Sequence, residues 1–168
     1  MPYSFEFDLS SIEGLLDDLG NQVGKAAAKG LYKGAGIVAD ALTESIAAIQ
    51  TEPFHYAKGG EQRLPSPQEK EALMRGKHGV AKFKGDGTEI ETSIGLGDSG
   101  YMHIMGTGSS KDKRTPVALI AHAIDSGTSF MQAQPFLKRA FSKSRGSALS
   151  AISATAEQEL QNIINAHE

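Results

Sequence analysis

"NQVGKAAAKGLYKGAGIVADALTESIAAIQ", residues 21–50, is the stretch that does most to decide the fold. Its apolar and small residues recur every three or four positions, at Val23, Ala27, Leu31, Gly34, Val38, Ala41, Ser45 and Ala48. This spacing predicts one long amphipathic helix, roughly 40 Å in length at about 1.5 Å per residue. Glycines at positions 24, 30, 34 and 36 each cost helix stability relative to alanine, so they indicate either a closely packed second backbone or a bend.

Two capping boxes mark where helices begin. Ser10 stands three residues before Glu13, so we expect the first helix to start beside it. Ser66, followed by Pro67 and Glu69, has the same spacing with a proline at the first helical position. The sequence therefore predicts a second, short helix after a loop rich in proline and glycine.

Residues 79–105 have the alternation of a three-stranded antiparallel meander. Loops at residues 85–88 and 97–100 would set oppositely charged or apolar residues opposite each other. The pairs are Lys84–Glu89, Lys82–Glu91, Phe83–Ile90, Leu96–Tyr101 and Ile94–His103. We therefore expect a sheet with one apolar face.

The last third of the chain predicts a loop, an apolar element and a final helix. The loop covers residues 106–116, and the apolar run at 117–125 is either a helix or a strand. Pro135 then starts the final helix. Its apolar stripe consists of Leu137, Phe141, Ala148, Ile152, Ala156, Leu160 and Ile163. Residues 143–147, KSRGS, are expected to interrupt or bend this helix.

The order of helix, strands and helix predicts an α+β fold. We expect a long N-terminal helix and a C-terminal helix that both pack on the three-stranded meander. A chain of 168 residues with 39% hydrophobic content has the usual size of one compact unit, so we expect a single domain over residues 1–168. Residues 51–66 and 106–116 would form its extended loops.

The composition excludes several classes of function. Without cysteine, the chain has no disulfide, no thiol nucleophile and no cysteine-ligated metal centre. Neither a run of about 18 apolar residues nor a signal-peptide pattern occurs, so we expect a soluble chain made in the cytoplasm, with no membrane contact. The formal net charge of −3 argues against a dedicated nucleic-acid binder.

Charge is unevenly distributed along the chain. Residues 1–20 hold five acidic residues and no lysine or arginine, whereas residues 111–145 hold seven basic residues against two acidic ones. Either both regions are ordinary solvated surface, or they meet head to tail between copies of the chain.

We find no motif for catalysis or cofactor binding. The five histidines never fall at the close spacings of zinc sites, and HExxH is absent. The loop at 106–113 lacks the glycine, lysine and serine order of a phosphate-binding loop, and SGTS at 126–129 lacks the GxSxG pattern of a nucleophile elbow. We therefore predict no enzyme activity, no metal and no cofactor.

"SGTSFMQAQPFLKRAF", residues 126–141, resembles the tail-completion and neck proteins of long-tailed bacteriophages, a family of head–tail joining proteins. The matching residues are Asp125, Gly127, Thr128, Ser129, Met131, Ala133, Pro135, Phe136, Leu137, Ala140 and Phe141. The opening "SFEFDLSSIEGLLDDLG", residues 4–20, is similar to the start of this family. Ser126, Gln132 and Arg139 depart from the pattern, since the family usually has an aromatic residue or a proline there.

The resemblance implies a non-enzymatic virion protein. Such a protein forms a ring, usually of six copies, at the head–tail junction or the top of the tail tube of a phage or a prophage-derived particle. Double-stranded DNA would pass through its lumen. Its partners would be further copies, a head-closure or connector protein, and a tail terminator or tail tube protein. It would be assembled in the cytoplasm of the host bacterium and located in the virion.

The same resemblance, with the nearby basic residues, suggests where copies or neighbours touch. The candidates are Gly127, Thr128, Met131, Pro135, Phe136, Phe141, Lys138, Arg139, Lys111, Lys113 and Arg114. Phe136 and Phe141 are expected to be buried anchors, either inside the subunit or across the ring.

A basic cluster leaves an alternative function open. It consists of Lys138, Arg139, Lys143 and Arg145, near the start of the final helix. Such clusters are usually solvated surface, but this one is placed where it would be able to meet phosphate groups. The alternative is a DNA-contacting accessory protein of phage assembly.

Overall fold

A computed structural model describes residues 10–76, 79–80, 94–95, 101–103 and 114–166. Within these ranges the chain forms four helices and four short strands. The helices are α1 (Ser10–Ala47), α2 (Pro67–Arg75), α3 (Val117–Ser126) and α4 (Phe136–Ala166). The strands are β1 (Gly79–Val80), β2 (Ile94–Gly95), β3 (Tyr101–His103) and β4 (Arg114–Pro116).

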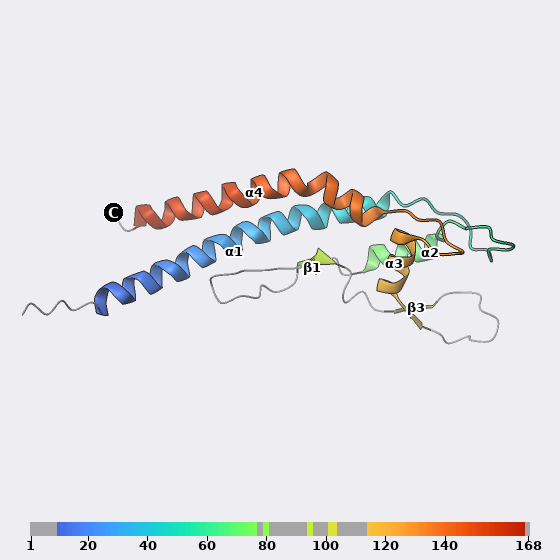
Figure 1. Ribbon diagram of the computed structural model, residues 1–168, viewed down its shortest axis with the longest axis horizontal. Coiled ribbons are helices and arrows are strands. Elements are labelled where there is room, and N and C mark those ends of the chain that lie inside the picture. The colour runs from blue at the N-terminus through green and yellow to red at the C-terminus, as the bar shows by residue number, and fades with distance from the viewer. Residues whose placement is uncertain (1–9, 77–78, 81–93, 96–100, 104–113, 167–168) are drawn as a thin grey trace, which may run out of the picture.

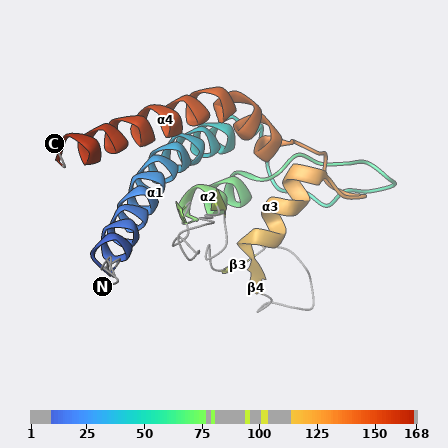
Figure 2. The same ribbon diagram turned by 60° about the vertical axis from the view of Figure 1, so that its left-hand side comes forward.

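A hairpin of the two long helices dominates the molecule. Helices α1 and α4 run antiparallel along their length, so the start of α1 and the end of α4 lie at the same end (Figure 1). Figure 2 shows that both helices curve, and that they move apart toward the start of α1 and the end of α4. The shorter helices α2 and α3 lie near the opposite end, where α1 ends and α4 begins (Figures 1 and 2).

Glycines of α1 let the two long helices approach closely. A Cβ built on Gly30 would lie 2.8 Å from the carbonyl oxygen of Ile152, and one built on Gly34 would lie 2.5 Å from the Ile152 side chain. At both positions another backbone or a large side chain occupies the space that a methyl group would need. Gly36 has nothing within 4 Å of such a Cβ. Close packing therefore accounts for Gly30 and Gly34, and not for Gly36.

The main apolar core lies where all four helices meet. It consists of Ala41, Leu42, Ile46, Ile49, Leu73, Val117, Ile120, Ala121, Ile124, Met131, Phe136 and Ala140. Lys70 of α2 joins this core to the end of α1, because its Nζ donates to the carbonyl oxygens of Ala47 (2.6 Å) and Ile49 (2.9 Å). The contacts satisfy carbonyls that the end of a helix leaves without a partner.

The predicted α+β fold with a three-stranded meander is wrong. The described strands are only two or three residues long and form two separate two-stranded ladders, β1 with β2 and β3 with β4. The two long helices pack mainly on each other, and α1 also contacts the short strands β1 and β2. Glycine-rich strands bury little apolar surface, whereas the first part of α4 buries Phe136, Ala140 and Ala148.

The pairing of the strands also differs from the prediction. The predicted register, continued outward, would set Gly79 opposite Ile94, but Gly79 pairs with Gly95. Strand β3 pairs with β4, so His103 faces Arg114 and not Ile94. The pairs predicted within 81–93, and Leu96, lie outside the described residues. Of the loop predicted at 106–116, residues 114–116 are strand and the rest is not described.

Several predictions on the helices are confirmed. One helix covers the predicted stretch from its start near Ser10 to Ala47, and α2 begins with the predicted capping box. The apolar run after Pro116 is helical, which resolves the choice between helix and strand. Helix α4 continues without a break through residues 143–147, so of the two predicted alternatives, an interruption or a bend, the interruption is wrong.

Candidate functional site

The segment between α3 and α4, residues 125–136, forms a tight joint. Gly127 has a φ of 75°, and a Cβ there would lie 3.0 Å from the backbone nitrogen of Ala133. The Gln134 amide donates to the carbonyl oxygen of Ile124 at 2.7 Å, and the Leu137 amide donates to Asp125 Oδ1 at 2.9 Å. Asp125 therefore satisfies a free amide in the first turn of α4, as a capping residue does.

Thr128 organises the turn inside this joint. Its hydroxyl oxygen accepts from the amides of Met131 (3.0 Å) and Phe130 (3.3 Å), while its own amide donates to the Met131 carbonyl at 2.9 Å. The turn directs Met131 into the core, where its side chain is buried. Phe130, the neighbouring residue, is half exposed.

A reciprocal amide contact connects the joint to the end of α1. The Gln50 amide donates to Gln134 Oε1 at 2.9 Å, and Gln134 Nε2 donates to the Gln50 carbonyl oxygen at 2.9 Å. The two residues are 84 positions apart in the sequence. Gln134 thus attaches the chain just before α4 to the chain just after α1.

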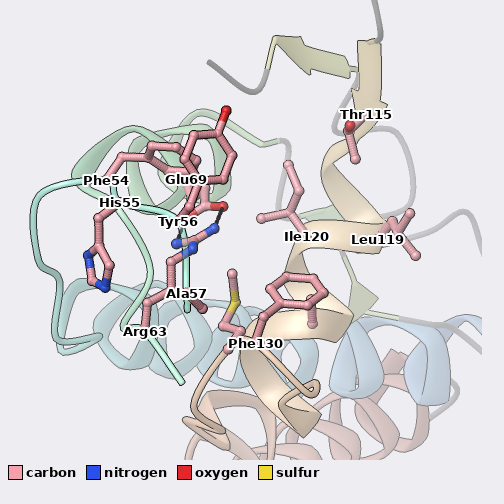
Figure 3. A pocket seen from close by; sticks show the side chains of 12 residues that line it. Phe54, His55, Tyr56, Ala57, Arg63, Glu69, Thr115, Leu119, Ile120 and Phe130 are labelled. Atoms are coloured by element: carbon pink, nitrogen blue, oxygen red, sulfur yellow. Dashed lines mark hydrogen bonds and ion pairs between the residues drawn. The ribbon is translucent and has the colours of Figure 1, made fainter. Parts of the chain in front are cut away.

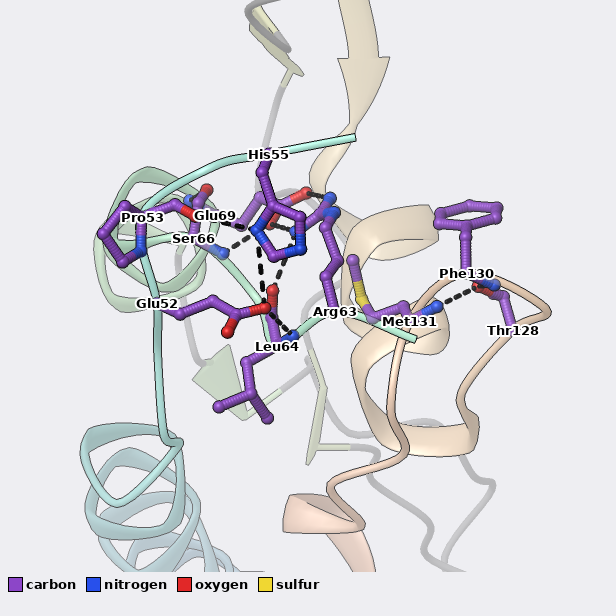
Figure 4. A network of polar contacts seen from close by, with 10 residues as sticks. All are labelled: Glu52, Pro53, His55, Arg63, Leu64, Ser66, Glu69, Thr128, Phe130 and Met131. Carbon is purple, nitrogen blue, oxygen red and sulfur yellow. Dashed lines mark hydrogen bonds and ion pairs between the residues drawn. The ribbon is translucent and has the colours of Figure 1, made fainter. Parts of the chain in front are cut away.

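Arg63 connects the loop at 51–66 to the same joint. Its amide donates to the Phe130 carbonyl oxygen and its carbonyl accepts from the Gln132 amide, both at 2.9 Å. These bonds form a parallel bridge between Arg63 and Met131. Gln62 Nε2 adds a bond of 2.6 Å to the Thr128 carbonyl oxygen. The loop and the joint are therefore one hydrogen-bonded unit. Figure 4 shows Arg63 beside Met131, with the contacts of Arg63 to Glu69 on one side and of Met131 to Thr128 on the other.

A buried ion pair lies at the centre of this unit. Arg63 Nη1 and Nη2 donate to Glu69 Oε2 and Oε1 at 2.8 and 2.6 Å, and the two side chains are only 6% and 3% exposed. Glu69 Oε2 also accepts from the Ser66 amide at 2.7 Å, which completes the capping box. Arg63 Nη1 donates in addition to the Leu64 carbonyl oxygen at 3.0 Å.

The surroundings of Glu69 keep it ionised. Burial alone would raise the pKa of its carboxyl group. The hydrogen bonds from Arg63 and the Ser66 amide, together with the charge of Arg63, outweigh burial and hold the pKa below its ordinary value. A paired carboxylate and guanidinium that are both bonded in this way act as a rigid structural contact.

A cavity of about 480 Å³ opens beside this ion pair. Figure 3 shows Phe54 and Tyr56 of the loop on one side of it, and Leu119, Ile120 and Phe130 on the other. The walls are mainly apolar. The Arg63 guanidinium lies 4.9 Å from the centre of the Phe54 ring, a cation–π distance. The Phe54 and Tyr56 rings meet edge to face, with centroids 5.4 Å apart.

The residues named as interface candidates fall into two groups. Met131 and Phe136 are buried in the core of the same chain, and Gly127 and Thr128 shape the joint. The exposed members are Pro135, Lys138, Arg139 and Phe141. Arg114 lies in β4. Lys111 and Lys113 lie outside the described residues.

The two phenylalanines have different surroundings. Phe136 is 0% exposed, which confirms it as an anchor of the core, whereas Phe141 is 50% exposed. Of the two alternatives for Phe141, burial inside the subunit is therefore wrong, and burial across the ring stays a prediction. Ala140 and Ser144 occupy the buried face of α4 instead.

The basic cluster on α4 does not form an uninterrupted positive surface. Its four members, Lys138, Arg139, Lys143 and Arg145, are all exposed. Lys143 Nζ pairs with Glu44 of α1 at 2.6 Å, and Arg139 Nε donates to the Pro135 carbonyl oxygen at 3.3 Å. The pairing with Glu44 offsets part of the charge that a phosphate backbone would meet.

The Arg63–Glu69 pair and the cavity were not foreseen from the sequence. The capping box pointed to Glu69 as a local helix signal, and the arginine six residues earlier carried no pattern of its own. Only the return of the loop at 51–66 onto the joint brings the two side chains together. The only hint of this ion pair in the sequence is an arginine in the predicted loop, six residues before the capping glutamate.

Other kinds of site were sought in the part of the chain that the structure describes. There, no three histidine, aspartate or glutamate side chains gather closely enough to hold a metal ion. None of the described helices combines the length and the apolar character needed to cross a membrane. Comparisons with protein-family models, with curated proteins and with solved structures find no match to this chain.

Proposed function

We propose that this chain is a structural virion protein that forms a ring of identical copies at the head–tail junction, or at the top of the tail tube, of a long-tailed bacteriophage or a prophage-derived particle. DNA passes through the lumen of the ring. The neighbours along the particle axis are a head-closure or connector protein and a tail protein.

The build of the α3–α4 joint carries this proposal. The residues that resemble the neck family take part in shaping the joint: Gly127 makes the turn, Asp125 caps α4, and Thr128 organises the loop. Met131 and Phe136 lock the joint into the core. A motif in which several residues serve to place a helix is suited to a protein whose task is assembly.

The distribution of exposed apolar side chains gives further support. Phe141 lies one residue beyond the buried Ala140 and presents half of its surface to solvent, close to the joint. Large apolar side chains exposed in this way often mark contacts between proteins. An exposed anchor on the helix that the joint positions is what a lateral contact between ring subunits requires.

Mass measurement in solution and negative-stain imaging of the purified full chain test the proposal. The expected result is a discrete oligomer, with six copies as the reference number, and particles that have a central hole. Tails purified from cells that express the chain should carry it at one end. A chain that stays monomeric at all concentrations and never associates with tails contradicts the proposal.

A further inference from the structure

The cavity beside Arg63 is an incomplete apolar site. Four large apolar side chains that line it, Phe54, Tyr56, Leu119 and Phe130, are among the exposed ones of the described residues. Apart from Phe141, the other exposed apolar side chains of the described residues, such as Leu149, are scattered along the helices, which is usual for a protein surface. A cavity of about 480 Å³ with aromatic walls has the size and character of a site that takes up bulky apolar groups.

Residues 1–9 of the chain have the chemistry to fill this cavity. In the sequence MPYSFEFDL the apolar side chains Tyr3, Phe5, Phe7 and Leu9 alternate with Ser4, Glu6 and Asp8. When a segment of this kind is extended, all its apolar side chains point to one side and its polar ones to the other. Extended peptides are recognised in this way, with alternate side chains entering pockets.

The geometry excludes binding within one chain. Helix α1 has 38 residues and is therefore about 57 Å long. The first cavity residue, Phe54, comes after the end of this helix, and Figure 1 places α3 near that end. The nine residues before α1 span at most about 32 Å when fully extended. They fall well short of their own cavity, so the occupant has to be the same segment of another copy.

The charges of the two partners are complementary. Residues 1–9 carry Glu6 and Asp8 without any basic residue. Thr115 in the cavity wall directly follows Lys113 and Arg114 in the sequence. An acidic segment is attracted to a basic stretch of the chain more than to an acidic one.

We propose that residues 1–9 of each copy occupy the apolar cavity of a neighbouring copy, with aromatic side chains inserted between Phe130 and the loop that holds Tyr56. The contact is head to tail, and repeated head-to-tail contacts close into a ring when the rotation between copies permits it. The inference rests on the proposed function in one respect, that copies of this chain lie side by side.

Mixing two defective full-length variants tests the contact. The segment variant is Phe5→Ser with Phe7→Ser, and the cavity variant is Leu119→Arg, at a side chain that is 58% exposed and hence tolerant of change. Each variant alone should be monomeric. A mixture should form one-to-one dimers, because one intact segment and one intact cavity remain. Leu149→Arg, with 54% exposure on α4, is the matched control and should assemble as the wild type does.

A labelled peptide of residues 2–10, PYSFEFDLS, separates this inference from the ring proposal. By fluorescence anisotropy it should bind the full-length segment variant and lose at least about tenfold in affinity when Leu119→Arg is added, as expected when a charge enters an apolar contact site. Binding without any ring in solution supports the contact and contradicts the ring. Rings that persist in both variants, with no peptide binding, overturn the contact and leave the ring proposal standing.

Discussion

At the scale of single residues, the Arg63–Glu69 pair is the most constrained feature of the molecule. Both side chains are almost fully buried, and two hydrogen bonds join the guanidinium to the carboxylate. Removing one partner of such a pair leaves the other charge buried without compensation, and this typically costs about 3–5 kcal/mol. An exposed pair, such as Arg75 with Glu71, contributes about 0–1 kcal/mol.

We therefore expect Glu69→Gln to lower the free energy of unfolding by about 3 kcal/mol. Glutamine keeps an oxygen that accepts from the Ser66 amide, so the capping box remains and the lost charge is isolated. Glu71→Gln, the matched control on the same helix, should change stability by less than about 1 kcal/mol. Urea denaturation of both variants measures the difference. Equal losses of unfolding free energy in the two variants would show that the buried pair stabilises the fold no more than an exposed pair does.

The pH dependence of stability gives a second prediction at this scale. The folded protein holds the pKa of Glu69 below the ordinary value of 4.5. The stability from the ionised group is therefore complete above pH 4.5 and is lost as pH falls through the lowered folded pKa. The stability difference between wild type and Glu69→Gln should be constant from pH 7 to about 5 and shrink in more acidic solution. Denaturation curves along this pH series measure it, and a difference that grows with acid contradicts the assignment.

Residue-scale features were predictable where the signal was local. The Ser66–Glu69 capping box follows from a spacing of three residues and is present as predicted. Phe141 could not be placed from periodicity, because Ala140 beside it takes the buried position. The partner of Glu69 could not be predicted either, since it depends on how the loop at 51–66 folds back.

At the scale of elements, the close contact between α1 and α4 gives two glycines of α1 different surroundings. Gly30 faces the carbonyl oxygen of Ile152, a backbone atom that cannot move away alone, while Gly36 faces open space. Both glycines weaken the helix by about 0.5–1 kcal/mol relative to alanine. The same substitution should therefore have opposite effects at the two positions.

We expect Gly36→Ala to stabilise the protein by about 0.5–1 kcal/mol through this helix effect. Gly30→Ala should destabilise it by about 1–3 kcal/mol, because its methyl group forces the two helices apart. Thermal unfolding followed by circular dichroism compares the two variants, which differ only in the position of one methyl group. If both raise the melting temperature, the close approach of α1 and α4 is not as described.

The elements also show which patterns in a sequence are decisive. The helix predicted over residues 21–50, which ends at Ala47, was predictable because many residues repeat the same spacing. Its glycines left close packing and bending open, and the position of α4 decides for close packing at Gly30 and Gly34. The meander failed because alternation over a few glycine-rich residues fits several pairings equally well. The alternation within residues 79–105 also carries no information on residues 114–116, which pair with β3.

At the scale of the whole molecule, the chain joins a long, slender hairpin to a small core. The core lies at one end, where the loop at 51–66, the joint and all four helices meet. One face of this region carries the cavity, and the first turns of α4 carry Phe141. Two distinct apolar features near the same end would allow each copy to contact more than one neighbour, which a ring requires.

Phe141 provides the last test of the ring. It is half exposed in the single chain, so Phe141→Ser should change the free energy of unfolding by less than about 1 kcal/mol. If the side chain lies across the contact between subunits, the same substitution should weaken assembly at least about tenfold, as the loss of an aromatic anchor does. Sedimentation velocity over a concentration series measures assembly, with Leu149→Ser as the control of similar exposure. A large loss of stability without any loss of assembly would assign Phe141 to the core and remove it from the ring contact.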